Sequence, residues 1–104
     1  MLAYRTTWIV EQGKMQEALE ALSALLDRTD LSTVEGGLAA RIYTPKIGPN
    51  VLVYEEVWEN AEAHDAFWNA YDSTSSEVAP FWAKWGELTK RSVGVDCWDV
   101  AEWR

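Results

Sequence analysis

Apolar and polar residues alternate along the first part of the chain and then change to a helical spacing. Residues 2–10 are rich in β-branched and aromatic types, a composition that predicts a β-strand. Beyond Gly13, which breaks this strand, apolar side chains recur at helical intervals over residues 14–28. This spacing predicts an amphipathic helix, because such residues share one helix face. The apolar stripe consists of Met15, Ala18, Leu19, Leu22, Leu25 and Leu26.

The rest of the chain carries patterns for three further strands and two further helices. The strands are expected over residues 38–44, 51–58 and 92–101, and the helices from Asn60 to about Tyr71 and over about 77–90. Pro45 and Gly48 mark a turn between the first two of these strands, which are therefore expected to form a hairpin. Asn60 is a favourable N-cap, and Pro80 is tolerated only near the first turn of the last helix.

This order of elements, β-α-β-β-α-α-β, is the split βαβ arrangement of the ferredoxin-like sandwich. We therefore predict an α+β fold in which helices cover one face of a four-stranded antiparallel sheet. A chain of 104 residues is long enough for one such domain and too short for two with separate cores. Residues 1–104 are accordingly expected to form a single domain.

Both faces of the predicted sheet carry apolar side chains, although the face without helices should be polar if it met water. Along the strand at 51–58, for example, one face carries Leu52, Tyr54 and Trp58, and the other carries Val51, Val53 and Val57. A second apolar face needs a second cover, and the simplest is another copy of the chain packed sheet to sheet about a two-fold axis. The sequence thus predicts a homodimer, and Trp103 is placed to reach the partner.

Composition adds an unusual aromatic content to this picture. The chain contains seven Trp and four Tyr but only two Phe. Buried Tyr and Trp need hydrogen-bond partners, so this mixture indicates a partly polar interior, either a pocket wall or a dimer interface. The lone Cys97 cannot form an internal disulfide, and we expect it to be a small buried side chain in a cytoplasmic protein.

Charge excludes two classes of partner. Nine basic and seventeen acidic residues give a net charge of −8, which argues against nucleic acid and against an anionic membrane surface. The N-terminus lacks the pattern of a signal peptide, and no apolar run is long enough to span a bilayer. Residues 47–83 hold acidic side chains without any Lys or Arg, which predicts a solvated acidic face rather than a metal site. These acids are Glu55, Glu56, Glu59, Glu62, Asp65, Asp72 and Glu77.

Two segments carry a resemblance to a known group of proteins. The stretch Val53-Tyr-Glu-Glu-Val-Trp58-Glu-Asn-Ala-Glu-Ala-His64 resembles a strand, cap and helix of the dimeric α/β-barrel superfamily. That superfamily includes antibiotic-biosynthesis-type monooxygenases and NIPSNAP-like proteins, and the later segment Phe81-Trp82-Ala-Lys-Trp85 is similar to the NIPSNAP side. The resemblance implies a ligand pocket between sheet and helices, and in some members a cofactor-free oxygenase acting on phenols. The residues that haem-degrading members use are not matched at the corresponding Thr6, Phe67 and Glu77.

His64 is the leading candidate for chemistry, because it is the only histidine and imidazole exchanges protons near neutral pH. Tyr54 is the second candidate for handling protons. The alternative for His64 is a partly exposed side chain bonded to a neighbour. An aromatic pocket for a flat ligand would be lined by seven Tyr and Trp residues, for which the alternative is an ordinary core. They are Tyr4, Tyr43, Tyr54, Trp8, Trp58, Trp68 and Trp82.

Arg5 and Arg41 lie in predicted strands among apolar residues, where a buried guanidinium has to be paired. They could anchor the carboxylate of a substrate. The favoured alternative is an ion pair with Glu55, Glu56 or Asp96.

Two functions are therefore expected. The first, which the family resemblance implies, is a cofactor-free monooxygenase or related enzyme that binds a small aromatic or polyketide-like substrate. The second is a non-catalytic, NIPSNAP-like stress or binding module whose aromatic residues form only core and dimer interface. The two differ in whether Arg5, Arg41 and Tyr54 meet at one cavity. Arginines paired with Glu55 or Glu56, together with the lack of a cavity near His64, would exclude the enzyme.

Overall fold

A computed structural model describes residues 1–104 and confirms the predicted α+β, ferredoxin-like fold. The elements in chain order are β1 (Leu2–Val10), α1 (Met15–Arg28), a short 3-10 helix (Leu31–Thr33), β2 (Gly37–Tyr43), β3 (Val51–Trp58), α2 (Ala61–Ala70), α3 (Ala79–Leu88) and β4 (Thr89–Asp99). The strands form one antiparallel sheet in the order β2-β3-β1-β4. The sheet is open, with β2 and β4 at its edges.

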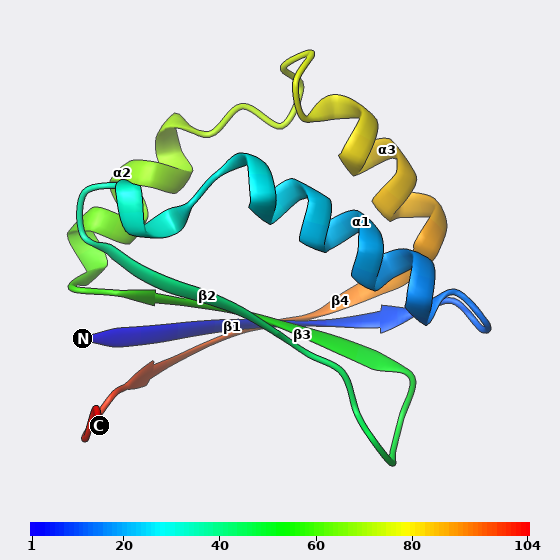
Figure 1. The fold of residues 1–104 in the computed structure, drawn as a ribbon, viewed down its shortest axis with the longest axis horizontal. Helices are drawn as coiled ribbons and strands as arrows, with labels where there is room; N and C mark the ends of the chain where they lie inside the picture. The colour runs from blue at the N-terminus through cyan, green and yellow to red at the C-terminus, as the bar shows by residue number, and fades with distance from the viewer.

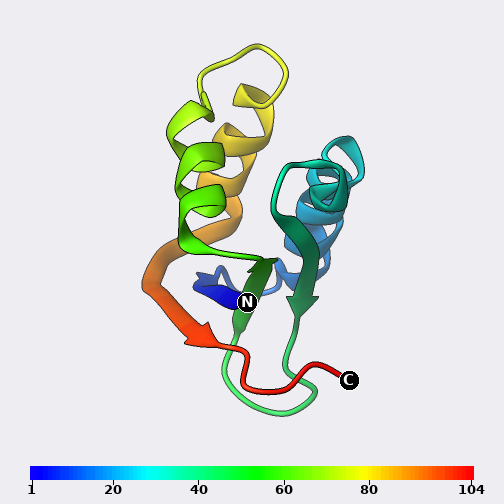
Figure 2. The ribbon, with the colours of Figure 1, turned by 90° about the vertical axis from the view of Figure 1, so that its left-hand side faces the viewer.

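All three helices lie on one face of the sheet (Figure 1). Seen from the side, α2 and α3 stand next to one another and α1 stands apart from α2, with the sheet below them (Figure 2). The segment between α2 and α3 arches over the layer of helices at the point farthest from the sheet (Figure 1). The helices thus form a layer over the sheet, with α1 on one side and α2 and α3 on the other, and side chains project into the region between these two sides and the sheet.

The register of the two central strands decides which side chains face the helices. Thr6 of β1 lies opposite Tyr54 of β3, and Tyr4 lies opposite Glu56. Because side chains alternate along a strand, Thr6, Tyr4, Tyr54 and Glu56 all point to the helical side, and Arg5 and Glu55 point to the other. The floor of the helical side is therefore aromatic and carries one carboxyl group.

The main hydrophobic core lies at one end of the sheet, where α1 and α3 meet. It consists of Val10, Ala18, Leu22, Leu52, Trp85 and Leu88. Trp8 of the sheet meets Trp85 of α3 edge to face, with ring centroids 5.7 Å apart. At the opposite end, Trp58 is fully buried beneath α2. The region between these two packed ends is where the cavity described below forms.

Local signals explain where the later helices begin. The Oδ1 atom of Asn60 accepts a hydrogen bond from the backbone N–H of Ala63 over 2.9 Å, so the predicted N-cap of α2 is confirmed. Pro80 occupies the first turn of α3, where its missing N–H leaves no helical bond unmade. Gly36 has a φ of +78°, and a side chain there would collide with Ala63 at the start of α2.

Two predictions about burial are wrong. Cys97 is exposed, because it lies on the edge strand β4, beyond the reach of the helices. Glu55 and Glu56 do not belong to a solvated acidic face: they retain 2% and 4% of their accessible surface. Both lie on the central strand β3, where Glu56 faces the helices and Glu55 is covered by the side chains of Arg5, Arg41 and Tyr43. The other five acids of that stretch are exposed as expected.

The face of the sheet opposite the helices is partly covered by the end of the chain, which passes beneath it (Figure 2). The backbone N–H of Val100 bonds to the carbonyl of Met1, and the ring of Trp103 lies 5.1 Å from the Arg41 guanidinium carbon. Trp98 and Trp103 remain more than half exposed and Tyr43 is 43% exposed.

No helix combines the length and the apolar character that crossing a membrane requires.

Candidate functional site

A cavity of about 360 Å³ lies between the sheet and the helices. Fifteen of its 19 lining residues are hydrophobic, and the others are Thr6, Thr29, Glu56 and His64. No Lys or Arg lines it. A mostly apolar cavity of this size with a few polar groups is the usual form of a small-molecule site.

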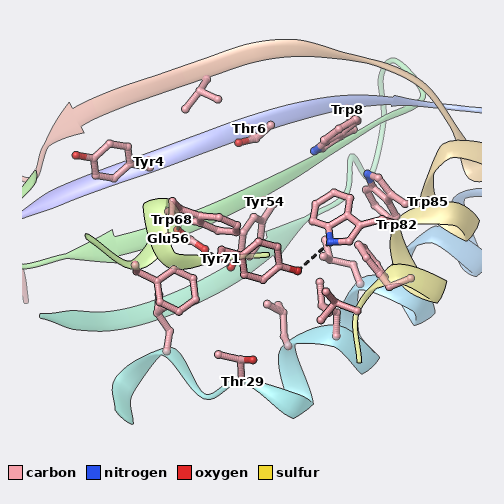
Figure 3. A pocket seen from close by; sticks show the side chains of 18 of the residues that line it. Tyr4, Thr6, Trp8, Thr29, Tyr54, Glu56, Trp68, Tyr71, Trp82 and Trp85 are labelled. Atoms are coloured by element: carbon pink, nitrogen blue, oxygen red, sulfur yellow. Dashed lines mark hydrogen bonds between the residues drawn. The ribbon is translucent and has the colours of Figure 1, made fainter. Parts of the chain in front are cut away.

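The sheet provides the floor of the cavity and the helices provide its walls (Figure 3). The floor is formed by Tyr4, Thr6, Trp8, Tyr54 and Glu56, with Val95 at the edge. The walls include Leu22, Leu25 and Leu26 from α1, His64, Phe67 and Trp68 from α2, and Phe81, Trp82 and Trp85 from α3. Tyr71 and Val78, at the two ends of the segment between α2 and α3, and Thr29 and Leu31, which follow α1, complete the lining.

The carboxyl group of Glu56 lies at the base of the cavity and accepts three hydrogen bonds from aromatic side chains. Its Oε1 atom accepts from the indole nitrogens of Trp68 at 2.8 Å and Trp58 at 3.1 Å. Its Oε2 atom accepts from the Tyr54 hydroxyl at 2.6 Å. The polar tips of three aromatic residues thus converge on one buried carboxyl, which accounts for part of the excess of Tyr and Trp over Phe.

Burial raises the pKa of the Tyr54 hydroxyl far above its usual range, and the negative charge of Glu56 and the hydrogen bond to it act in the same direction. Burial, together with Cys97, also raises the pKa of Tyr4. Both hydroxyls therefore keep their protons and act as donors in the cavity.

His64 lies in the wall of the cavity on α2, and its side chain is 20% exposed. Its ring stacks on the ring of Tyr4, with centroids 3.6 Å apart and planes within 2° of parallel. The Nδ1 atom is 2.9 Å from a carboxylate oxygen of Asp65. Since an ionised carboxylate only accepts, this contact places the proton of the neutral ring on Nδ1 and leaves Nε2 as an acceptor.

A second pair of aromatic residues closes the side of the cavity away from the sheet. The indole nitrogen of Trp82 donates to the Tyr71 hydroxyl over 2.8 Å, which ties α3 to the end of α2 (Figure 3). The side chain of Arg28 reaches the backbone carbonyl of Glu77 over 2.7 Å, so α1 is tied to the same segment. These two bonds hold the arch between α2 and α3 in place above the site.

Arg5 and Arg41 lie on the opposite face of the sheet and both bind Glu55. The Nε atom of Arg5 is 2.6 Å from Oε2, the Nη1 atom of Arg41 is 3.1 Å from Oε1, and the Tyr43 hydroxyl donates to Oε1 over 3.2 Å. Burial by itself would raise the pKa of the Glu55 carboxyl, but these three hydrogen bonds outweigh it and hold that pKa below its usual range.

The structure therefore divides the predicted site residues into two groups. The cavity contains His64, Tyr54, Trp8, Trp68 and Trp82. Arg5, Arg41 and Tyr43 face away from it, and Trp58 is buried beneath it without reaching its surface. Arg5 and Arg41 consequently do not meet Tyr54 at one cavity, and both form the ion pair favoured on sequence grounds. The placement of the arginines therefore gives no support to an enzyme, whereas the cavity beside His64 meets the other condition set by the sequence.

Sequence reasoning did not select Glu56 or Tyr71 for the site. For Glu56 a signal was present, because in an alternating strand it shares a face with Tyr54 and Trp58. A carboxylate between two aromatic residues on the face that turns towards helices has to find donors there.

No three His, Cys, Asp or Glu side chains gather closely enough to hold a metal ion.

The fold and the cavity together define a ferredoxin-like α+β protein with an aromatic pocket between sheet and helices. The sequence profile of the antibiotic biosynthesis monooxygenase family matches residues 1–72, which run from β1 through α2. The chain belongs to this family. No curated protein matches the sequence.

Solved structures share the fold at low sequence identity. A candidate antibiotic biosynthesis monooxygenase from Nitrosomonas europaea superposes with a TM-score of 0.72 at 11% identity, over 98% of this chain and 100% of that one. A second, from Deinococcus radiodurans, gives 0.69 at 13% identity over 100% and 96% of the two chains. A variant of SnoaB, a cofactor-independent oxygenase from Streptomyces nogalater, gives 0.69 at 11% identity over 98% and 94%.

Proposed function

We propose that this protein is a monooxygenase that acts without a cofactor on a small aromatic or polyketide-like substrate. The observation that carries the proposal is the aromatic cavity itself, placed between sheet and helices in a member of the antibiotic biosynthesis monooxygenase family. A volume of about 360 Å³ accommodates a substrate of two or three fused rings. The structural likeness to a cofactor-independent oxygenase supports the type of reaction.

In such a reaction the substrate supplies all the electrons that dioxygen accepts. A ring carbon bearing two hydrogens loses one as a proton, and the resulting carbanion binds O2 and regains a proton to give a hydroperoxide. Loss of the second hydrogen as a proton, with cleavage of the O–O bond, leaves a carbonyl and releases water. One oxygen atom enters the product, the other leaves as water, and no further reductant is needed.

His64 is suited to the proton transfers in this sequence. The contact between Nδ1 and Asp65 leaves Nε2 free to take a proton from the substrate and return it to the peroxide. Stacking on Tyr4 fixes the plane of the imidazole at the cavity wall. Tyr54, whose raised pKa keeps its proton in place, serves as a hydrogen-bond donor rather than as a base.

The test is oxygen transfer to anthrone, a three-ring probe whose central carbon bears two hydrogens. With ¹⁸O2 we expect anthraquinone carrying one labelled oxygen, formed faster than without protein and equally fast after treatment with a metal chelator. His64→Ala should lower this rate about a hundredfold, the typical contribution of one acid–base group. A rate equal to that of the uncatalysed reaction, or one that requires added flavin or metal, would contradict the proposal. Binding of anthrone without oxygen transfer would instead indicate the non-catalytic module.

We also propose that the protein is a homodimer joined through the sheet face that lacks helices. Tyr43, Trp98 and Trp103 leave large apolar surfaces exposed on that face. Large aromatic side chains are typical of the buried centres of protein interfaces. The Arg5–Glu55–Arg41 cluster would lie within such an interface and provide it with polar contacts.

A further inference from the structure

The charged and titratable side chains of the cavity lining are few and of unequal sign. Glu56 is the only acidic side chain that lines it, and neither Lys nor Arg balances its charge there. His64 is the only lining residue able to become cationic. A ligand in this cavity therefore meets a single carboxyl group surrounded by mostly apolar walls.

Glu56 also keeps an unused position for a hydrogen bond. A carboxylate accepts about four hydrogen bonds, two at each oxygen. Oε1 already receives two, from Trp58 and Trp68, whereas Oε2 receives one, from Tyr54. The residue is 4% exposed and belongs to the cavity lining, so its small accessible surface faces the cavity. A ligand with a donor group can complete the coordination of Oε2.

We infer that Glu56 makes this cavity selective for flat aromatic ligands that carry a hydroxyl or ammonium group and no carboxylate. The inference deepens the proposed function and rests on it in taking the cavity as the substrate site. Glu56 is assigned here as a specificity-determining residue, with its Oε2 atom as the acceptor for the ligand's donor.

A ligand carboxylate is disfavoured because it would be brought next to a second carboxylate in a cavity with few polar groups. Two like charges interact more strongly in such a medium than in water, and the ligand would also lose its hydration. Arg5 and Arg41 cannot relieve this repulsion by direct contact, since both lie on the opposite face of the sheet and are engaged by Glu55.

A ligand ammonium is favoured by the same arrangement. It can donate to Oε2, and charge-assisted hydrogen bonds are stronger than neutral ones. The rings of Tyr54, Trp68 and Tyr71 line the cavity beside Glu56 (Figure 3), and the faces of aromatic rings attract cations. A neutral hydroxyl makes the same hydrogen bond without the gain in charge attraction, so it should rank between ammonium and carboxylate.

The experiment compares three naphthalene probes that differ only in the group at position 2: 2-naphthylmethylammonium, 2-naphthol and 2-naphthoate. Their dissociation constants are measured by isothermal titration calorimetry at neutral pH with the intact protein. We expect the ammonium and the naphthol to bind at least about tenfold more tightly than the carboxylate, the effect of one hydrogen bond to a charged group. In Glu56→Gln the dissociation constants of the three probes should differ by no more than about threefold.

Glu59→Gln is the matched control, because it removes the same charge one residue beyond the end of β3 at an exposed position. It should keep the ranking of the original protein. Equal binding of 2-naphthoate and 2-naphthol by the original protein, an unchanged ranking in Glu56→Gln, or the same change in both variants would overturn the inference while leaving the cavity a ligand site. Failure of all three probes to bind would overturn the proposed function together with it.

Tyr54→Phe provides a second test that retains the buried carboxylate. Loss of the tyrosine hydroxyl frees another acceptor position on Oε2. The affinity for 2-naphthylmethylammonium should then rise about threefold or more while that for 2-naphthoate does not. A parallel rise for both probes would overturn the inference even if Glu56→Gln did not fold.

Discussion

The indole nitrogen of Trp68 donates a hydrogen bond to Oε1 of Glu56 over 2.8 Å. Through this bond a helix that lies over the sheet is joined to a carboxylate that rises from it. The same oxygen also accepts a hydrogen bond from the indole nitrogen of Trp58. Glu56 of the cavity floor is therefore bonded both to Trp68 in the wall and to Trp58 at the packed end of the sheet. A buried carboxylate with these donors is stable only while the aromatic residues stay in place, which couples the shape of the cavity to the stability of the fold.

Trp68→Phe should destabilise the protein more than Trp82→Phe does. The first change leaves a buried charged acceptor without one of its donors, which costs about 1–3 kcal/mol, whereas the second removes a bond between neutral groups, worth about 0.5–1.5 kcal/mol. Both changes remove the same atoms from a cavity-lining indole, so the loss of packing is matched. Urea denaturation followed by circular dichroism measures the two free energies of unfolding, and equal values would contradict this account.

Glu55→Gln should destabilise the protein in a manner that depends on pH. The folded-state pKa of Glu55 lies below the ordinary value of 4.5, so its carboxylate adds stability above that pH and loses it as the pH falls through the folded-state pKa. We expect a loss of about 1–3 kcal/mol near neutral pH, limited because Arg5 and Arg41 are nearly half exposed. The difference should shrink towards zero in acid.

The measurement is a series of denaturation curves for Glu55→Gln and the original protein between neutral pH and about pH 3. Glu35→Gln serves as the control, because Glu35 is exposed and makes no side-chain hydrogen bond. Glu35→Gln should change the free energy of unfolding by no more than about 0.5 kcal/mol over the whole pH range. A difference for Glu55→Gln that is constant with pH would show that the ion pairs do not carry the effect.

The strands and helices could be predicted from local patterns because each pattern was set by the residues that form it. The strand at 51–58 was predicted with its true bounds, and Asn60 and Pro80 fixed the starts of two helices. Burial was harder to predict, since it depends on the order of strands in the sheet. Cys97 is exposed because β4 is an edge strand, and Glu55 is buried because β3 is central.

The candidate site was predicted in part for the same reason. Local periodicity places His64 and Trp68 on one face of a helix, and both line the cavity. It also places Arg5 in a strand among apolar residues, but which face of that strand meets the helices is decided by tertiary packing. Alternation along β3 places Glu56 on the same face as two of its donors, Tyr54 and Trp58, but the third donor, Trp68, comes from α2 and reaches Glu56 only through tertiary packing.

Filling the cavity should abolish ligand binding without unfolding the protein. Thr6 lies in the middle of the floor opposite Tyr54, and Thr6→Phe places a ring in open space rather than in packed core. We expect the affinity for 2-naphthol to fall at least about tenfold and the stability to change by less than about 1 kcal/mol. Thr7→Phe is the control, because Thr7 faces the other side of the sheet and should leave binding unchanged. Equal loss in both variants would place the ligand outside the cavity.

Trp98→Glu should convert the proposed dimer to single chains. Trp98 is 57% exposed on the sheet face without helices, opposite Ala3 in the register of β1 and β4, and a carboxylate there would be buried without a partner on association. Such a charge costs several kcal/mol, enough to separate two copies at micromolar concentration. Light scattering should give twice 11.8 kDa for the original protein and 11.8 kDa for the variant. Val95→Glu, on the opposite face of the same strand, should stay dimeric, and a mass of 11.8 kDa for the original protein would rule out the dimer under these conditions.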